Sequence, residues 1–108
     1  MSGKNILEII QHVPGKVIQN DFDLINESTD LKNQQLILSE DMLQIEVSDQ
    51  ITFDIGWYSK PNENGTFIVF IIKDEDWESP LFKKKCYSLK TLKKAIEKCA
   101  EMLGSTNI

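Results

Sequence analysis

One uninterrupted apolar run, TFIVFIIK at 66–73, constrains the fold of this chain more than any other feature. Its apolar residues do not alternate with polar ones, which is typical of a strand covered on both faces. A second apolar run, ITFDIGWY at 51–58, precedes it, and the connection at 59–65 is rich in Pro, Asn and Gly. Two such runs around turn-forming residues predict a β-hairpin. We expect the rest of the chain to cover or extend this hairpin.

The first strand of the hairpin has two unlike faces, because successive side chains of a strand point in opposite directions. One face is expected to hold the core residues Ile51, Phe53, Ile55 and Trp57. The other face is expected to meet solvent with Thr52, Asp54 and Tyr58. Gly56 within the strand indicates either a β-bulge or a close approach by another backbone segment.

The segments before the hairpin are shorter and less regular. Apolar spacing predicts a helix over 3–13, which Pro14-Gly15 ends. Residues 16–27 fit neither a period of two nor one of 3.6, so a short strand and an irregular crossing both stay open, and the polar residues 26–35 are expected to form a loop. Alternation within 36–47 predicts two short strands joined by a tight turn.

The segments after the hairpin end in a helix. Residues 74–81 read as an acidic loop, and FKKKCY at 82–87 reads as an edge strand, where lysines discourage unwanted pairing. Ser88 is a good N-cap and Gly104 a good helix stop. Between them runs a helical apolar stripe of Leu89, Leu92, Ile96, Cys99 and Leu103.

These elements predict an α+β fold. It consists of an antiparallel β-meander of three to five strands, a short N-terminal helix, and a C-terminal helix packed on one sheet face. The length of 108 residues fits a single domain over 1–108. We expect its core within 36–103 and a frayed tail over 104–108.

The charge distribution excludes two classes of partner. The net charge is −5, there is no Arg, and seven of the twelve Lys follow residue 81. Nucleic acids and anionic membranes need a basic footprint, so neither is expected as the main partner, and the lysines read as a solvated face. The chain shows no signal peptide and no membrane-length apolar run, which predicts a cytoplasmic protein with reduced Cys86 and Cys99.

The chain offers no recognisable catalytic constellation. His12 is the single histidine and stands at the end of the predicted first helix. No base–nucleophile pair, phosphate-binding glycine loop or zinc motif is present. We therefore predict that the protein is not an enzyme, and that it uses neither a cofactor nor a metal.

An acidic and aromatic cluster is the candidate binding surface. Asp74, Glu75, Asp76 and Glu78 surround Trp77 in one loop. The loop lacks the spacing of a calcium site. It can instead be a solvated turn with Trp77 folded onto the core, or an aromatic anchor rimmed by carboxylates that binds a basic protein. In the second case the predicted contacts are Asp54, Tyr58, Asp74, Glu75, Asp76, Trp77 and Glu78.

The pattern of residues 55–97 points to a family. It runs Gly56-Trp57-Tyr58, a polar loop ending at Gly65, a strand, Asp76-Trp77-Glu78 with Pro80-Leu81, and Ser88-Leu89 opening a helix. This pattern resembles small bacterial immunity proteins encoded beside polymorphic toxins, including those of contact-dependent growth inhibition systems. The resemblance implies an acidic cytoplasmic protein that binds and neutralises a cognate toxin with a basic surface, often a nuclease, and it carries over no catalytic residue.

A second hypothesis comes from a different class of function. A small regulatory or adaptor domain could homodimerise through an exposed sheet edge. An immunity protein is expected to be a monomer or a weak dimer, so the molecular mass in solution separates the two hypotheses.

Overall fold

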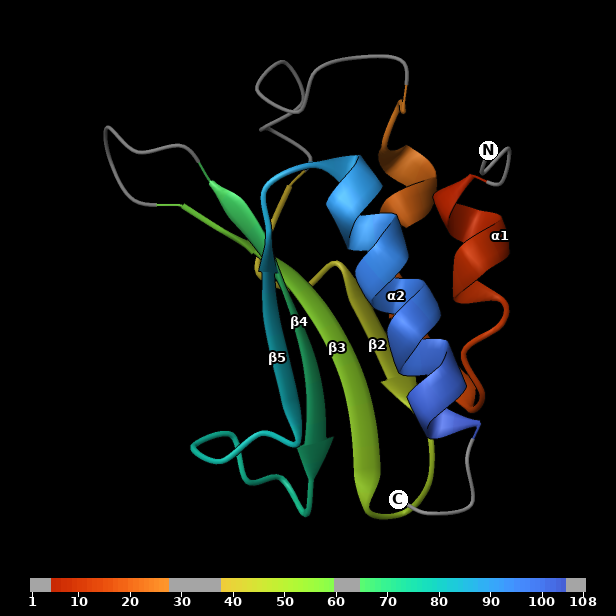
Figure 1. The fold of residues 1–108 in the computed structure, drawn as a ribbon, viewed down its shortest axis with the longest axis vertical. Coiled ribbons are helices and arrows are strands. Elements are labelled where there is room, and N and C mark those ends of the chain that lie inside the picture. The colour runs from red at the N-terminus through yellow and green to blue at the C-terminus, as the bar shows by residue number, and fades with distance from the viewer. Residues whose placement is uncertain (1–4, 28–37, 60–64, 105–108) are drawn as a thin grey trace.

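The computed structural model describes residues 5–27, 38–59 and 65–104, and it confirms the predicted α+β meander (Figure 1). All strands pair antiparallel in one sheet of order β1-β2-β3-β4-β5. The elements in chain order are α1 (Ile6–Ile10), β1 (Lys16–Asn20), the 3-10 helix η1 (Phe22–Leu24), β2 (Leu43–Glu46), β3 (Ile51–Tyr58), β4 (Thr66–Lys73), β5 (Phe82–Cys86) and α2 (Leu89–Leu103).

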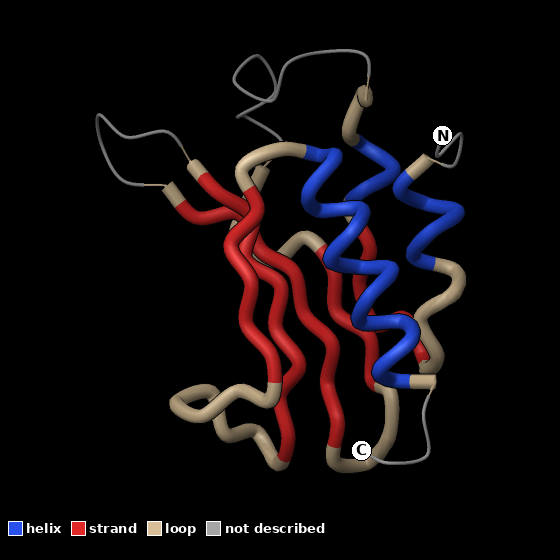
Figure 2. Tube along the Cα trace, in the orientation of Figure 1, coloured by secondary structure: helices blue, strands red, loops and turns tan. Residues whose placement is uncertain are grey.

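The helices lie on one face of the sheet, which we call the inner face (Figure 2). The predicted stripe of α2 is confirmed, because Leu92, Ile96 and Cys99 are completely buried. Ser88 caps the helix, because its hydroxyl oxygen accepts a hydrogen bond from the Thr91 amide at 3.2 Å. The Thr91 hydroxyl oxygen in turn accepts a hydrogen bond from the Ser88 amide. The sheet side of this core consists of the buried residues Ile45, Phe53, Ile55, Phe67, Val69 and Ile71.

Strand β4 is covered on both faces, as its lack of alternation predicts. Phe67, Val69 and Ile71 point toward the helices and are fully buried. On the opposite side, Ile68 and Ile72 are only 9% and 1% exposed. Strand β5 is the edge strand predicted for the lysine-rich segment, and its three central lysines are exposed.

The N-terminal segment contributes to the core as well. Helix α1 is shorter than the predicted 3–13; it begins after the N-cap Asn5, which accepts a hydrogen bond from the Glu8 amide at 2.9 Å. The ambiguous region 16–27 divides into β1 and η1. Because Ile6, Ile9 and Phe22 are each 1% exposed, the core is wider than the range 36–103.

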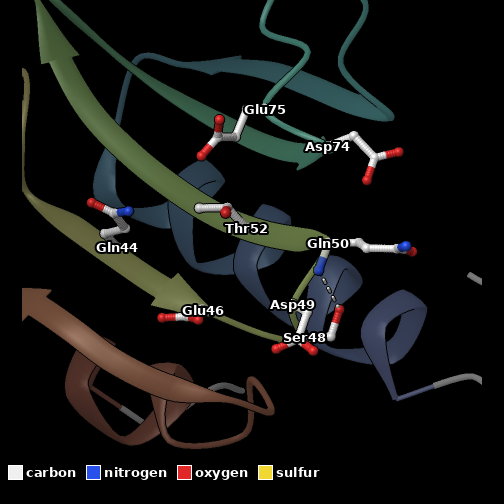
Figure 3. A pocket seen from close by; sticks show the side chains of 8 residues that line it. All are labelled: Gln44, Glu46, Ser48, Asp49, Gln50, Thr52, Asp74 and Glu75. Carbon is white, nitrogen blue, oxygen red and sulfur yellow. Dashed lines mark hydrogen bonds between the residues drawn. The ribbon is translucent and has the colours of Figure 1, made fainter.

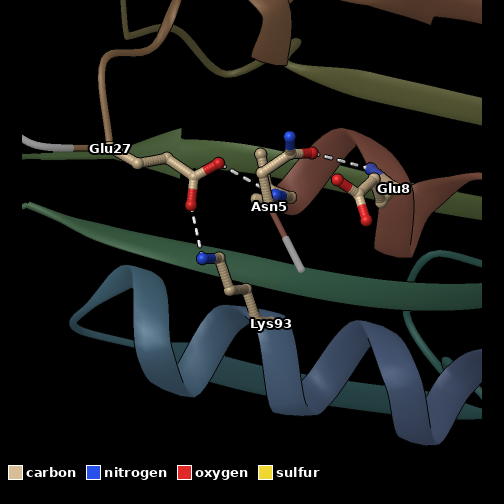
Figure 4. A network of polar contacts seen from close by, with 5 residues as sticks. Asn5, Glu8, Glu27 and Lys93 are labelled. Carbon is tan, nitrogen blue, oxygen red and sulfur yellow. Dashed lines mark hydrogen bonds and ion pairs between the residues drawn. The ribbon is translucent and has the colours of Figure 1, made fainter. Parts of the chain in front are cut away.

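Glu27 ties the N-terminal segment to α2 (Figure 4). Its carboxylate forms an ion pair with Lys93 and accepts a hydrogen bond from the Ile6 amide at 2.9 Å. Partial burial raises the pKa of this carboxyl, but the contacts with Lys93 and Ile6 lower it more, so that the net pKa lies below its usual value. Glu27 therefore stabilises the fold above its ordinary pKa, and this contribution is lost as the pH falls.

The prediction of two strands within 36–47 is wrong for its described part. Only Leu43–Glu46 forms a strand. Residues 39–42 are irregular and cross β3 instead, and we call them the crossing segment. Two hydrogen bonds hold it there, from the Met42 amide to the Ile55 carbonyl at 3.0 Å and from the Trp57 amide to the Ser39 carbonyl at 2.7 Å. Residues 28–37, which include most of the predicted loop 26–35, lie outside the described residues.

Gly56 is the place where the crossing segment meets β3. A Cβ atom built on Gly56 would lie 2.2 Å from the carbonyl oxygen of Glu40, which is far below a possible contact distance. Of the two alternatives for this glycine, the close approach by another backbone segment is therefore confirmed. At the C-terminus, Gly104 caps α2 with a φ of −77°, so it does not use the left-handed conformation, and residues 105–108 lie outside the described residues.

Candidate functional site

The face of the sheet opposite the helices, which we call the open face, holds most of the predicted site residues. No helix covers it within the described ranges 5–27, 38–59 and 65–104 (Figure 2). The antiparallel register sets side chains of neighbouring strands in rows across this face. One row consists of Gln19, Gln44, Asp54, Phe70 and Lys83. The next row toward the β2–β3 turn consists of Lys16, Glu46, Thr52 and Ile72.

An acidic concavity lies at the end of the open face where β2 turns into β3 (Figure 3). Its volume is about 450 Å³ and four of its eight lining side chains are carboxylates, with no lysine among them. The lining residues are Gln44, Glu46, Ser48, Asp49, Gln50, Thr52, Asp74 and Glu75. Within the described residues, no group of three or more His, Cys, Asp or Glu side chains is arranged to hold a metal ion. The concavity is therefore a strongly negative surface, suited to a positively charged group.

A strained turn places two of these carboxylates. Asp74 and Glu75 have φ values of 54° and 59°, and the Asp76 amide donates to the Lys73 carbonyl at 3.0 Å. Positive φ at both central residues defines a type I′ turn, for which Gly, Asn and Asp are the favoured residues. Glu75 is unsuited to this conformation, which costs a non-glycine residue roughly 1–2 kcal/mol.

Replacing Glu75 with Gly is expected to raise the free energy of unfolding by about 0.5–1 kcal/mol, because the relief of left-handed strain exceeds the added entropy of glycine. Urea denaturation measures the change. Glu78→Gly is the matched control, since Glu78 is exposed in the same loop and is not among the positive-φ residues. The free energy of unfolding of the control is expected to fall by up to about 1 kcal/mol. Equal losses in both variants would show that the turn stores no strain.

Asp54 lies in the middle of the open face and departs from its prediction. It was expected to face solvent, but it is only 8% exposed. The crossing segment packs onto Gly56, the next residue of β3 on the same face, and we infer that it shields Asp54 from solvent. Burial, and to a smaller extent the charge of Asp41, raises the pKa of the Asp54 carboxyl to about 6.

Tyr58 lies beyond Gly56 on the same face and is half-buried. Burial raises the pKa of its hydroxyl, with further contributions from the charges of Asp54, Glu40 and Asp41. The open face therefore has a second group of acidic and polar side chains besides the concavity. This group lies toward the crossing segment and consists of Asp41, Asp54 and Tyr58.

The exposure of Trp77 argues against the alternative in which it is folded into the core. It is 49% exposed, and its ring packs edge-on against Phe70 with 5.6 Å between ring centroids. Trp77 is therefore not a core residue, but an exposed aromatic side chain on the open face. Lys83 contacts the same Phe70 ring, with its Nζ atom 5.8 Å from the ring centroid.

The remaining predicted residues divide into two groups. Asp74 and Glu75 enter the acidic concavity, whereas Asp76 and Glu78 are exposed in the loop and do not line it. Asp76 accepts a hydrogen bond from the Ser79 amide at 3.3 Å within that loop. The sequence prediction missed Glu46 and Asp49. Pairing the strand 43–46 with 51–58 through their short turn would have placed both at this end of the sheet.

No family model, curated protein or solved structure matches this chain. Its function must therefore be inferred from its own residues. No helix among the described residues is long and apolar enough to cross a membrane.

The two cysteines are poorly placed for nucleophilic chemistry. Cys86 and Cys99 are fully buried, and burial raises the pKa of the Cys99 thiol to about 12, which suppresses the reactive thiolate. The open face, in contrast, offers two acidic areas and an exposed aromatic ring. Such a surface is complementary to a basic protein surface.

Proposed function

We propose that this protein is an immunity protein, which binds a cognate toxin of the nuclease type in the cytoplasm and neutralises it stoichiometrically. The observation that carries the proposal is the acidic concavity on a sheet face that no described helix covers. The sequence pattern of residues 55–97 suggests the same class of protein, although no family model or curated protein matches the chain.

The charge of the open face gives the proposal its physical basis. A nuclease binds the phosphates of its substrate through a positively charged surface. A protein with four carboxylates around one concavity can compete for that surface. Complementary charge also accelerates association, which matters because a toxin must be bound before it acts. The exposed Trp77, which packs against Phe70, can supply the aromatic contact that protein interfaces commonly use.

Co-expression with the toxin domain encoded in an adjacent reading frame tests the function directly. We expect restored growth of the host and a one-to-one complex in solution. A toxin that kills in the presence of this protein, with no complex formed, would refute the proposal.

Charge reversal tests the surface. The double variant Asp49→Lys/Glu75→Lys is expected to slow association with that toxin by about tenfold or more at low salt, because it reverses two charges of the concavity. The matched control is Glu97→Lys/Glu101→Lys, which makes the same change of charge at exposed positions of α2. Stopped-flow kinetics measures both, after circular dichroism confirms that both variants are folded. If the two variants slow association equally, the open face is not the binding surface.

One observation favours the alternative of an adaptor that homodimerises. Val17 and Ile18 lie on the edge strand β1 and are 50% and 49% exposed, so this edge could pair with a second copy. Light scattering after size exclusion distinguishes the two functions. The immunity function predicts a monomer at micromolar concentration, whereas a dimer that Ile18→Lys dissociates would favour the adaptor.

A further inference from the structure

Asp54 is the one buried charged side chain among the described residues, at 8% exposure. Its carboxylate oxygens still reach solvent, because no fully buried side-chain oxygen or nitrogen of the described residues lacks a hydrogen-bond partner. No hydrogen bond or ion pair of the described residues reaches its carboxylate. Its strand partners on the two sides are Gln44 and Phe70, and Phe70 offers a ring and no donor.

The groups around Asp54 do not neutralise it. The crossing segment contributes Glu40 and Asp41, and β3 itself contributes Thr52 and Tyr58. The nearest cation in the same row is Lys83 of β5, which lies beyond Phe70 and over the ring of that residue. The neighbouring charges are thus negative where a buried carboxylate would be stabilised by a positive one.

The partial loss of water around Asp54 makes its ionised form less favourable, and a cation paired with it would offset that cost. Burying an unpaired charge is strongly unfavourable, whereas a paired and hydrogen-bonded charge is tolerated. Asp54 is partly reachable from outside, and the acidic concavity lies beside it, since Gln44 and Thr52 flank Asp54 and line that concavity. An incoming basic group would be attracted by the concavity and could then pair with Asp54.

We propose that Asp54 is the receptor for one basic side chain, a lysine or an arginine, that the protein partner projects onto the open face. The inference rests on the proposed function for the identity of that partner as a basic protein. It also assigns different roles to the acidic groups. The exposed carboxylates of the concavity speed association, whereas Asp54 holds the bound partner.

This assignment has a consequence for pH. Since the pKa of the free Asp54 carboxyl is about 6, part of the population is protonated in mildly acidic solution. A partner cation binds the ionised form only, so binding releases a proton and strengthens as the pH rises from 5 to 7.

Methylguanidinium and methylammonium chloride are the probes for a test that needs no partner. The pKa of the Asp54 carboxyl is followed by carbon-detected NMR in about 100 mM of each probe and in equal sodium chloride. At a probe concentration of twice the dissociation constant, the pKa of Asp54 is expected to fall by about 0.5, by the linkage relation. The carboxyls of Glu97 and Glu101 on α2 serve as the internal reference. A larger response to methylguanidinium indicates an arginine, and a larger response to methylammonium indicates a lysine.

Two variants decide between a specific receptor and general charge attraction. Probe-induced shifts of the Gly56 amide signal are expected to disappear in Asp54→Asn and to persist in Asp49→Asn, which removes an equal charge from the concavity. Shifts that persist in Asp54→Asn, or an Asp54 pKa that falls no more than those of Glu97 and Glu101, would overturn the inference.

The two proposals can fail separately. Suppose that the probes do not lower the pKa of Asp54, while Asp49→Lys/Glu75→Lys still slows association with the toxin. The proposed function is then supported, and the receptor role of Asp54 is rejected. With the toxin in hand, Asp54→Asn is expected to raise the dissociation rate constant at least tenfold and to leave the association rate constant within about twofold. The reverse pattern would place Asp54 among the steering charges and contradict the receptor.

Discussion

Asp54→Asn is expected to raise the free energy of unfolding at pH 7 by about 2 kcal/mol. The pKa of Asp54 is about 6 in the folded protein, whereas an aspartate in an unfolded chain titrates near 4. A difference of about two pKa units corresponds to roughly 2.7 kcal/mol of destabilisation when the carboxyl is ionised in both states. Asparagine removes the charge but keeps a buried amide without a partner, so we expect somewhat less than the full gain.

The sign of the pH dependence follows from the same shift. Between pH 6 and pH 4 the folded protein binds more protons at Asp54 than the unfolded chain does, so stability increases as the pH falls. The wild-type protein should therefore gain about 2 kcal/mol between pH 7 and pH 4.5. Below that range stability falls again, because Glu27 becomes protonated and its lowered pKa no longer contributes.

Urea denaturation at intervals of half a pH unit measures both effects. The free energy of unfolding of Asp54→Asn should be almost constant between pH 5 and pH 7. That of the wild type should increase as the pH falls. Asp49→Asn is the control, since Asp49 is exposed, and it should keep the wild-type slope. A wild-type stability that falls steadily from pH 7 to pH 5 would show that Asp54 is well solvated.

The stability effect and the proposed binding role have one origin. A carboxylate that destabilises the free protein is stabilised when a partner cation reaches it, so the free-energy cost is recovered in the complex. An aspartate at this position is unfavourable for folding alone, since asparagine should fold better. The proposed binding function would explain why such a residue stands on the open face, as strained groups often do at functional sites.

The parts of the fold that were predicted correctly are those in which local sequence decides. The apolar run 66–73, its partner 51–58 and the stripe of α2 each show their own period, and a cap or turn marks their ends. The acidic concavity is different, because it joins Glu46 and Asp49 with Asp74 and Glu75. That junction depends on strand register, and no local pattern reveals register.

The burial of Asp54 is the clearest case in which a correct local pattern gave a wrong environment. Its alternation with Ile55 places it on the face away from the helices, and this is confirmed. Whether that face is wet depends on the path of residues 39–42, which approach β3 only because position 56 has no side chain. Gly56 was the available signal, but a glycine does not tell which backbone approaches it.

Gly56→Ala is expected to lower the free energy of unfolding by about 3 kcal/mol, since overpacking against a rigid neighbour is among the costliest substitutions. The added methyl group would lie 2.2 Å from the Glu40 carbonyl oxygen, and backbone atoms cannot rotate away as a side chain can. The crossing segment must then move, which weakens the hydrogen bonds from the Met42 amide and to the Ser39 carbonyl. Urea denaturation measures the loss.

The same substitution should also change Asp54. When the crossing segment withdraws, Asp54 gains water and moves away from Asp41, the two causes that raise its pKa. The pKa of Asp54 should therefore fall toward 4, and the rise in stability toward acid should disappear along with it. Gly104→Ala is the control, because Gly104 has an ordinary φ of −77° at the end of α2, and it should change stability by no more than about 0.5 kcal/mol. A destabilised Gly56→Ala protein whose Asp54 still titrates near 6 would show that the crossing segment does not cause the burial of Asp54.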